Sequence, residues 1–303
     1  MGERKLIRQG GGGFTIYLPK KWVNKKNLKE GDVVKVTETD TALIIGAEVK
    51  EKQEITLTLN DENRQDIYPL LTHVYRKGFN RIKIQGISAS DLKKVKQIVN
   101  DLLLGFEITE IKKDYCKIEN ISEPSEGKYE TILRKVFLLI TETQDAIQEE
   151  FSKSKYDPKE IQELRNHSDK FILFCRRLLV KEKHEANITL EWELLTFLMH
   201  IQHAYYYLYK YAADNKIKID KKTISYLDEL KNYFEFYSDA YFNKNIKAIH
   251  KINNLKEKYQ FGSCLASIEK SKGKNSVVYS YIRELFRLMQ IGASPILSSI
   301  IHY

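Results

Sequence analysis

Hydrophobic and polar residues follow three different patterns along this chain, and the first is an alternation near the N-terminus. Alternation is typical of half-buried strands, and it predicts them at residues 14–18, 34–36 and 43–45. Pro19 favours a helix start, because proline lacks an N–H that the first helical turn would leave unbonded. We therefore expect a helix of about two turns over residues 20–27 and a turn at 38–41 between the last two strands.

The second pattern alternates between strands and helices. Strands are predicted at residues 55–59, 81–85, 106–111 and 115–121. A helix over 61–77 holds Pro69, where proline can kink the axis. Ser88 or Ser90 can cap a second helix, which runs to Leu103 with an apolar stripe. This part is predicted to be a small β-α-β-α-β-β unit with crossover connections.

The third pattern is helical and covers the rest of the chain. Apolar residues recur at helical spacing in six segments: residues 126–153, 158–183, 188–214, 220–241, 244–271 and 275–302. Their similar lengths suggest two sets of three helices, an internal repeat of roughly 90 residues. We therefore predict an all-α bundle.

Glycine usage changes along with the pattern. Ten of the 14 glycines precede residue 106, which suits strands and turns early and long helices later. We predict an α+β multidomain protein with three parts. They are residues 1–50, 51–122 and 123–303, the last in two halves at about 123–215 and 216–303.

Composition limits the class of protein. With 303 residues, of which 42% are hydrophobic and 30% charged, the chain can bury a core and is too apolar for long disorder. Its apolar runs are short and its N-terminus lacks the apolar stretch of a signal peptide, so we expect neither membrane insertion nor secretion. Cys116, Cys175 and Cys264 lie far apart, and this odd number predicts free thiols in a reducing cytoplasm.

The net charge of +9 is concentrated at one end of the chain. Residues 1–30 hold eight basic residues against Glu3 and Glu30, a local charge of +6. Basic side chains on neighbouring strands and a short helix would converge on phosphate groups and bind them in a salt-dependent way. The alternative is a solvated face that only keeps the protein soluble.

Four consecutive glycines, Gly10, Gly11, Gly12 and Gly13, lie within this basic segment. A phosphate-binding loop needs its glycines between a strand and a helix N-terminus. Here a predicted strand follows the glycines, and no Gly-Lys-Ser/Thr appears. We therefore favour a flexible hinge between two strands.

Residues of the first 45 positions occur in a recognisable order: Arg8, Gly10 to Gly13, Thr15, Ile16, Leu18-Pro19-Lys20, Leu28, Gly31-Asp32, Val34 and Leu43-Ile44-Ile45. This order resembles the SpoVT-AbrB (MazE-like) swapped-hairpin family of DNA-binding domains. The resemblance implies an obligate dimer, in which two chains exchange hairpins and present a basic surface to DNA. The DNA contacts that it implies are Arg4, Lys5 and Arg8 on the first strand and Lys20 and Lys21 after the proline.

The helical part resembles PhoU, a phosphate-uptake regulator built from two repeated three-helix bundles. Archaeal chains that join an AbrB-like N-terminus, a β-α-β linker domain and a PhoU-like C-terminus are similar to this chain from end to end. PhoU bundles bind metal through acidic residues one helical turn apart. Here Arg165 stands where a second acid would accompany Asp169, and the third and sixth helices lack these acids. We therefore expect no metal site and no cofactor.

Two further features have a functional and a structural interpretation. His200 and His203 could meet one metal ion, but they lack a clear third ligand, so we favour core or partly exposed histidines. The tyrosines of residues 205–211 could stack nucleobases, but helical aromatic residues are more often packed in a core. No arrangement typical of a catalytic site stands out.

From these features we predict a cytoplasmic, non-enzymatic transcription regulator that binds DNA as a homodimer. Its PhoU-like helical part would receive a signal from a protein partner of a phosphate transport or signalling system. The alternative is a protein-interaction adaptor in phosphate or stress signalling, which would use the AbrB-like fold only to dimerise.

Overall fold

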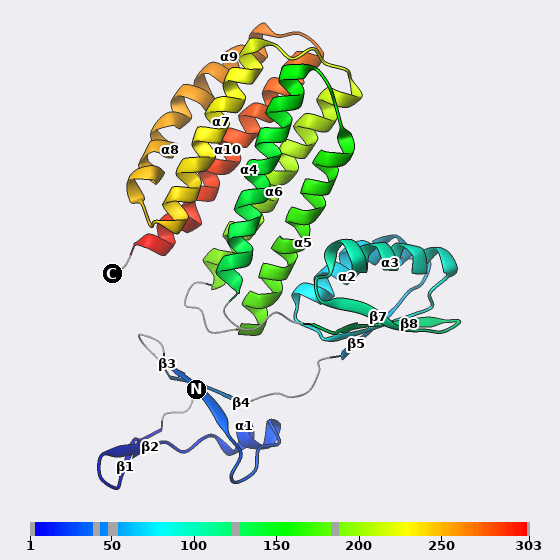
Figure 1. The fold of residues 1–303 in the computed structure, drawn as a ribbon. Helices are drawn as coiled ribbons and strands as arrows, with labels where there is room; N and C mark the ends of the chain where they lie inside the picture. Colours follow the sequence, from blue (N-terminus) through cyan, green and yellow to red (C-terminus); the bar gives the residue numbers. More distant parts are fainter. Residues whose placement is uncertain (1–3, 39–42, 48–53, 123–127, 183–187, 302–303) are drawn as a thin grey trace. The chain divides into compact units, whose positions relative to one another are not determined.

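The chain divides into two compact units, Met1–Lys52 and Gln53–Tyr303. Figure 1 shows them in the computed structural model, which describes residues 4–38, 43–47, 54–122, 128–182 and 188–301. A strand-rich N-terminal region precedes a mostly helical C-terminal region, which confirms the α+β class. The three-part division of the chain stays a prediction.

The first unit consists of two separate hairpins and a short helix. Strands β1 (Ile7–Gln9) and β2 (Gly13–Thr15) pair antiparallel, and so do β3 (Val34–Glu38) and β4 (Leu43–Ala47). Helix α1 (Lys20–Lys25) lies between the two hairpins in the sequence. Strand β2 is shorter than predicted, because the chain leaves its partner β1 before it reaches the proline. Most of the predicted turn at 38–41 lies outside the described residues.

The side chains described in this first unit are all at least partly exposed. They include nine large apolar residues: Leu6, Ile7, Phe14, Ile16, Tyr17, Val33, Val36, Leu43 and Ile44. A single two-stranded hairpin is only marginally stable in water, because it has no second layer to cover its apolar face. The described residues of one copy of this unit therefore form no core of their own.

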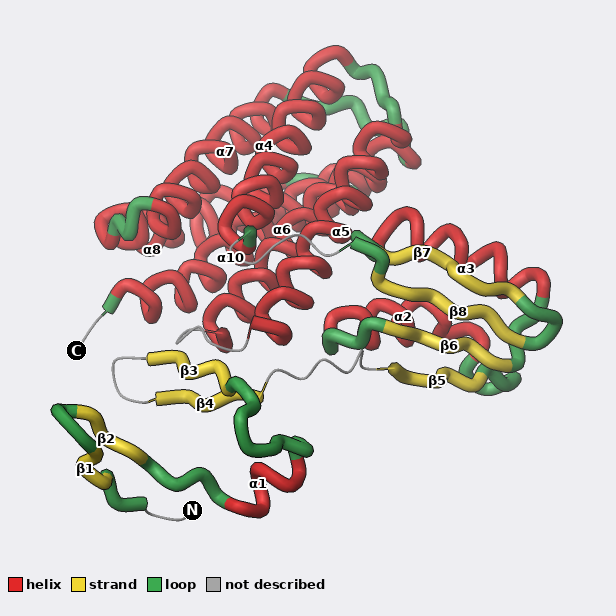
Figure 2. The backbone as a smooth tube through the Cα atoms, turned by 60° about the horizontal axis from the view of Figure 1, so that its bottom comes forward, coloured by secondary structure: helices red, strands yellow, loops and turns green. Residues whose placement is uncertain are grey.

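The second unit begins with a four-stranded sheet in the order β5-β6-β8-β7. Its strands are β5 (Glu54–Thr58), β6 (Arg81–Gln85), β7 (Phe106–Ile111) and β8 (Tyr115–Asn120). Strand β5 runs parallel to β6, whereas β8 is antiparallel to both of its neighbours (Figure 2). The predicted strand-helix order is confirmed, with β8 inserted between the two strands that the second crossover joins.

Two helices, α2 (Ile67–Arg76) and α3 (Ala89–Leu102), cover one face of this sheet (Figure 1). The predicted helix start at 61 is wrong, because a single 3₁₀ turn at Arg64–Asp66 precedes α2. Pro69 therefore lies in the first turn of α2. An N–H at this position would have no acceptor within the helix, so proline is tolerated there without a kink of the helix axis.

Ser88 rather than Ser90 caps α3. Its hydroxyl accepts the Asp91 N–H at 3.2 Å, and the Asp91 carboxylate accepts the Ser88 N–H at 2.9 Å. Asp91 is only 1% exposed and also receives the Arg64 guanidinium. The reciprocal cap satisfies two N–H groups that a helix N-terminus leaves unbonded.

The remainder of the second unit is helical. Its helices are α4 (Tyr129–Lys153), α5 (Pro158–Glu182), α6 (Ile188–Asp214), α7 (Lys221–Phe242), α8 (Ile246–Lys258), α9 (Cys264–Lys270) and α10 (Lys274–Ile300). The prediction of one helix over 244–271 is wrong, because a wide π turn at Tyr259–Ser263 separates α8 from α9. Gly262 suits this turn, since a Cβ there would lie 2.7 Å from the Glu257 carbonyl oxygen.

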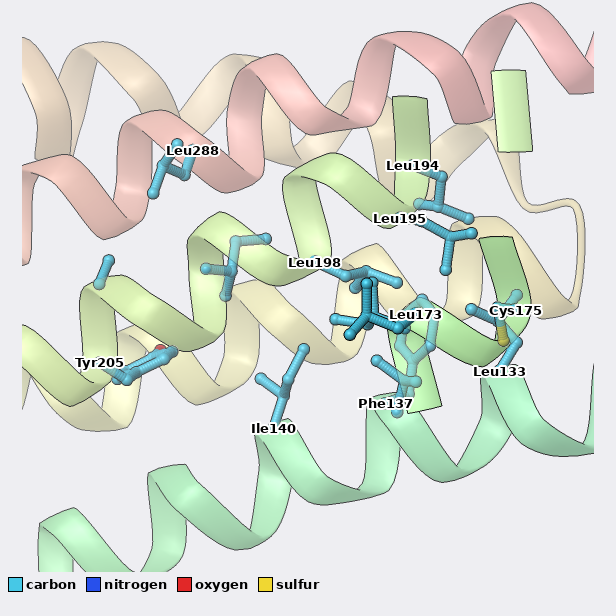
Figure 3. Packing of buried hydrophobic residues seen from close by; sticks show 14 of the residues in the cluster. Leu133, Phe137, Ile140, Leu173, Cys175, Leu194, Leu195, Leu198, Tyr205 and Leu288 are labelled. Atoms are coloured by element: carbon cyan, nitrogen blue, oxygen red, sulfur yellow. The ribbon is translucent and has the colours of Figure 1, made fainter. Parts of the chain in front are cut away.

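In the order of the chain, α4, α5 and α6 form a first group of helices and α7 to α10 a second. The division into two halves at about residue 215 stays a prediction. The groups share one core, in which α6 lies along α10 and α4 contacts α7. Figure 3 shows this core, in which Leu133 of α4 lies beside Cys175 of α5, and Phe137 of α4 lies beside Leu173 of α5. The apolar residues at helical spacing thus lie buried between packed helices, as the pattern predicted.

Helix α5 also packs against α2 and α3 and so joins the α/β region to the bundle. Arg177 of α5 is fully buried at this junction. Its guanidinium donates to the carbonyl oxygens of Tyr75 and Phe79, at 2.9 and 2.8 Å, and to Asn80 Oδ1 at 2.7 Å. A side chain of the bundle therefore closes the turn between α2 and β6.

Candidate nucleic-acid interface

The five basic residues predicted to contact DNA are all exposed and all lie in the first unit. Arg8 is the central residue of β1, opposite Phe14 of β2. Arg4 and Lys5 precede β1 rather than lying on it, because pairing with β2 begins only at residue 7. Lys20 and Lys21 are the first two residues of α1.

The four glycines form the connection between β1 and β2. Gly10 and Gly12 have positive φ angles of 62° and 126°, a conformation that glycine adopts without strain. The Gly12 N–H donates to the Gly10 carbonyl at 2.9 Å, whereas Gly13 already belongs to β2. The connection is therefore a tight hairpin turn followed by a strand, and it does not have the strand-to-helix geometry of a phosphate loop.

The first unit holds further lysines at the end of α1 and in the turn that follows it. Gly31, with φ at 88°, follows α1, and Asp32 Oδ2 accepts the Lys29 N–H at 2.7 Å. Lys25, Lys26 and Lys29 lie on or after α1, and all are exposed. Exposed lysines attract phosphate groups without reading bases.

Arginine and lysine differ in what they can recognise on DNA. The planar guanidinium can bind guanine O6 and N7 together, whereas the lysine ammonium is a point charge. Of the five predicted contacts, only Arg4 and Arg8 can make the paired contact. The five predicted residues are therefore better suited to binding phosphate groups than to reading bases.

Histidines and acids of the helical unit form a pair rather than a metal cluster. His203 Nε2 lies 2.8 Å from Asp169 Oδ1, and Arg165 lies 3.8 Å from the same carboxylate. His200 is exposed, but part of its ring is covered. This partial burial lowers the pKa of His200, and the nearby His203 and Arg176 lower it further. In the described ranges, no three His, Cys, Asp or Glu side chains come together as metal ligands would.

The tyrosines of residues 205–211 are divided between core and surface. Tyr205 and Tyr209 are buried, and the Tyr205 hydroxyl accepts from Gln144 Nε2 at 2.7 Å. Tyr207 is 45% exposed. The prediction that part of this run belongs to the core is confirmed.

The sequence did not predict that three charged residues of the second unit are buried: Arg177, Glu191 and Arg176. Each is buried, although charged helical residues usually face solvent. Glu191 accepts hydrogen bonds from Tyr129 and Tyr241 at 2.7 and 3.0 Å. Its partners lie on α4 and α7, far away in sequence, so local periodicity carries no signal of them.

Comparison with known proteins finds a similarity near the N-terminus of the chain. None of the described helices is long and apolar enough to cross a membrane. The chain matches no curated protein and no solved structure. Residues 7–56 match the family model of MazE, described as antidote-toxin recognition by a bacterial antitoxin. These residues therefore carry a domain of the MazE/AbrB-like type.

Proposed function

We propose that this chain is a transcription regulator that binds DNA as a dimer and receives a signal through its helical unit. The observation that carries the proposal is the MazE-type match on residues 7–56. It falls on the unit where exposed apolar side chains and a concentration of cations occur together.

The exposed apolar residues support dimerisation. Val36 and Ile45 face each other in the β3-β4 hairpin, and Val36 is 56% exposed. Removing such residues from water is worth roughly 25 cal/mol per Å² of apolar surface. Because one copy cannot bury them, a second copy that adds its hairpins would complete the core, as the MazE-like resemblance implies.

The position of the charge supports DNA binding. Residues 1–30 contribute +6 of the total charge of +9, so the remaining 273 residues are nearly neutral. A dimer doubles this local excess on one surface. Neutralising phosphates with lysine and arginine releases bound cations from DNA, which makes affinity depend strongly on salt.

We further propose that the helices α4 to α10 of the second unit receive the signal. The bundle formed by α4 to α10 supports the PhoU-like resemblance, and through it a link to phosphate uptake and to an archaeal-type regulator. The acids that hold metal in PhoU bundles are replaced here, as by Arg165 beside Asp169. The proposed signal is therefore a ligand or a protein partner rather than a metal, and no catalytic activity is assigned.

A second candidate function is a protein-interaction adaptor. The matched family is described by its recognition of a toxin, so exposed apolar residues of the first unit could instead bind another protein. This function predicts little salt-dependent affinity for DNA.

Fluorescence anisotropy of a labelled duplex at low salt separates the two functions. We expect wild-type protein to bind, and the variant with Arg4, Arg8, Lys20 and Lys21 changed to Ala to lose binding by about 100-fold or more. The control replaces four exposed lysines of the second unit: Lys93, Lys94, Lys96 and Lys113. No binding by the wild type, or equal loss in both variants, would contradict DNA binding by the first unit.

A further inference from the structure

Two arginines share one indole ring where α2, α5 and α6 meet. The guanidinium carbon of Arg76 lies 5.7 Å from the centre of the Trp192 ring, and that of Arg176 lies 5.3 Å from it. His73 lies beside Arg76, whose guanidinium donates to its ring at 2.9 Å. Cations from two helices thus converge on one aromatic side chain of a third.

Arg176 is almost completely removed from water. Its side chain is 3% exposed, and its Nη2 donates to Thr196 Oγ1 at 2.8 Å. Its Nε is buried without a hydrogen-bond partner. Burial lowers the pKa of this guanidinium to about 10, and the positive charge of Arg76 adds to the effect.

Neither arginine forms an ion pair with a carboxylate in the part of the chain that the structure describes. Asp169 is an acid near Arg176, but its carboxylate is already engaged by His203 at 2.8 Å and lies 3.8 Å from Arg165. Burying a cation without a counter-charge is costly, and a second cation beside it adds repulsion. Stacking on Trp192 offsets only part of this cost, since a cation–π contact is weak compared with an ion pair to a buried counter-charge.

We infer that Arg76 and Arg176 form a binding site for a small oxyanion, a phosphate group that is either free or part of a small ester. A phosphate would supply the missing counter-charge and accept the buried Nε–H and the guanidinium N–H groups. Arginine suits this role because its planar fork of donors matches phosphate oxygens. This site is independent of the DNA-binding surface, because it lies entirely within the second unit.

Trp192 provides a direct measurement of this site. The chain has two tryptophans, so Trp22→Phe leaves Trp192 as the sole source of indole emission. Titration with inorganic phosphate, at constant ionic strength set with chloride, is expected to change that emission in a saturable way within about 10 mM. A parallel titration with methyl phosphate distinguishes free phosphate from an ester by which of them binds more tightly.

Three variants in the Trp22→Phe background test the residues. Arg76→Met, at a half-buried position, is expected to weaken phosphate binding about tenfold or more, and Arg176→Lys to weaken it as well. The control is Arg134→Met, because Arg134 also stacks on an aromatic ring, at 4.1 Å from that of Phe242, but is paired with Glu130. Emission that follows chloride and phosphate alike, or equal affinity in Arg76→Met and the control, would overturn the inference.

Discussion

At the scale of single residues, buried polar side chains join elements that the apolar core alone would leave loosely connected. Arg177 holds the turn after α2 through three hydrogen bonds, and Glu191 links α6 to α4 and α7 through two tyrosine hydroxyls. Each group is buried but hydrogen-bonded, and this offsets the cost of removing it from water.

Replacing Arg177 by Met is expected to destabilise the protein by about 3 kcal/mol, because two carbonyl oxygens and Asn80 Oδ1 would lose a buried donor. Urea unfolding followed by circular dichroism measures the change. The matched control is Arg134→Met on the surface of α4, which should cost less than about 1 kcal/mol. Equal effects in the two variants would show that Arg177 does not hold the turn.

Asp91 gives the cap of α3 a pH dependence. Burial opposes its charge, but hydrogen bonds from Ser88 and the Arg64 guanidinium outweigh burial and hold its pKa below the usual value. A carboxyl group whose pKa is lowered by folding stabilises the protein above its unfolded pKa and loses this effect as the pH falls through the folded value.

We therefore expect Asp91→Asn to cost about 1–2 kcal/mol at pH 7 and progressively less below about pH 4. Urea unfolding of wild type and variant at several pH values checks this. Asp61→Asn, at an exposed position, serves as the control and should change stability by less than about 0.5 kcal/mol. A difference that stays constant or grows towards low pH would contradict the role of the Asp91 charge.

At the scale of elements, the contact between α6 and α10 depends on one small residue. A Cβ at Gly292 would lie 3.0 Å from Phe197 and 2.9 Å from the Tyr237 hydroxyl. That hydroxyl donates to the Gly292 carbonyl oxygen at 2.9 Å. Glycine therefore lets the two groups of helices approach each other along this line.

Gly292→Ala tests the close approach. Alanine improves helix propensity by about 1 kcal/mol, but overpacking costs about 1–3 kcal/mol, so we expect a net loss of about 1 kcal/mol in the free energy of unfolding. Ser294→Ala, exposed on the same helix, should be nearly neutral. If Gly292→Ala stabilised the protein, the propensity term would prevail and the proposed tight contact would be wrong.

Elements could be predicted from sequence wherever the signal is local. The strands over 81–85 and 106–111 have the predicted bounds, because alternation and flanking glycines mark them. The wide turn after α8 was missed, since a π turn keeps helical spacing on both sides. Of the candidate site, the charge and the glycine turn could be predicted, but the pairing of His203 with Asp169 depends on residues 34 positions apart.

At the scale of the whole molecule, two units have complementary properties. The second unit has a continuous core, and its positive charge is spread over many more residues, whereas the first unit has a charge of +6 within residues 1–30 and exposed apolar residues. Neither property alone would indicate DNA binding. Their coincidence with the MazE-type match on residues 7–56 supports the proposed dimer with a basic surface.

Val36→Asp is expected to weaken the dimer, because a charge on this exposed apolar position would be buried between two copies. At micromolar concentration, the variant should sediment as a monomer when the wild type sediments as a dimer. Leu138→Asp on α4 is the control, since Leu138 is similarly exposed at 49% but lies in the second unit. Equal behaviour of the two variants would argue against dimerisation through the first unit.

The salt dependence of DNA affinity tests whether the first unit binds DNA through its basic side chains. Each phosphate contact contributes about −0.9 to the slope of log affinity against log salt concentration. If Arg4, Arg8, Lys20 and Lys21 contact phosphate in both copies of a dimer, changing all four to Ala should make the slope shallower by up to about 7. We predict a steep slope for the wild type and a clearly shallower one for this variant. Parallel lines, or wild-type affinity that does not change with salt, would contradict it.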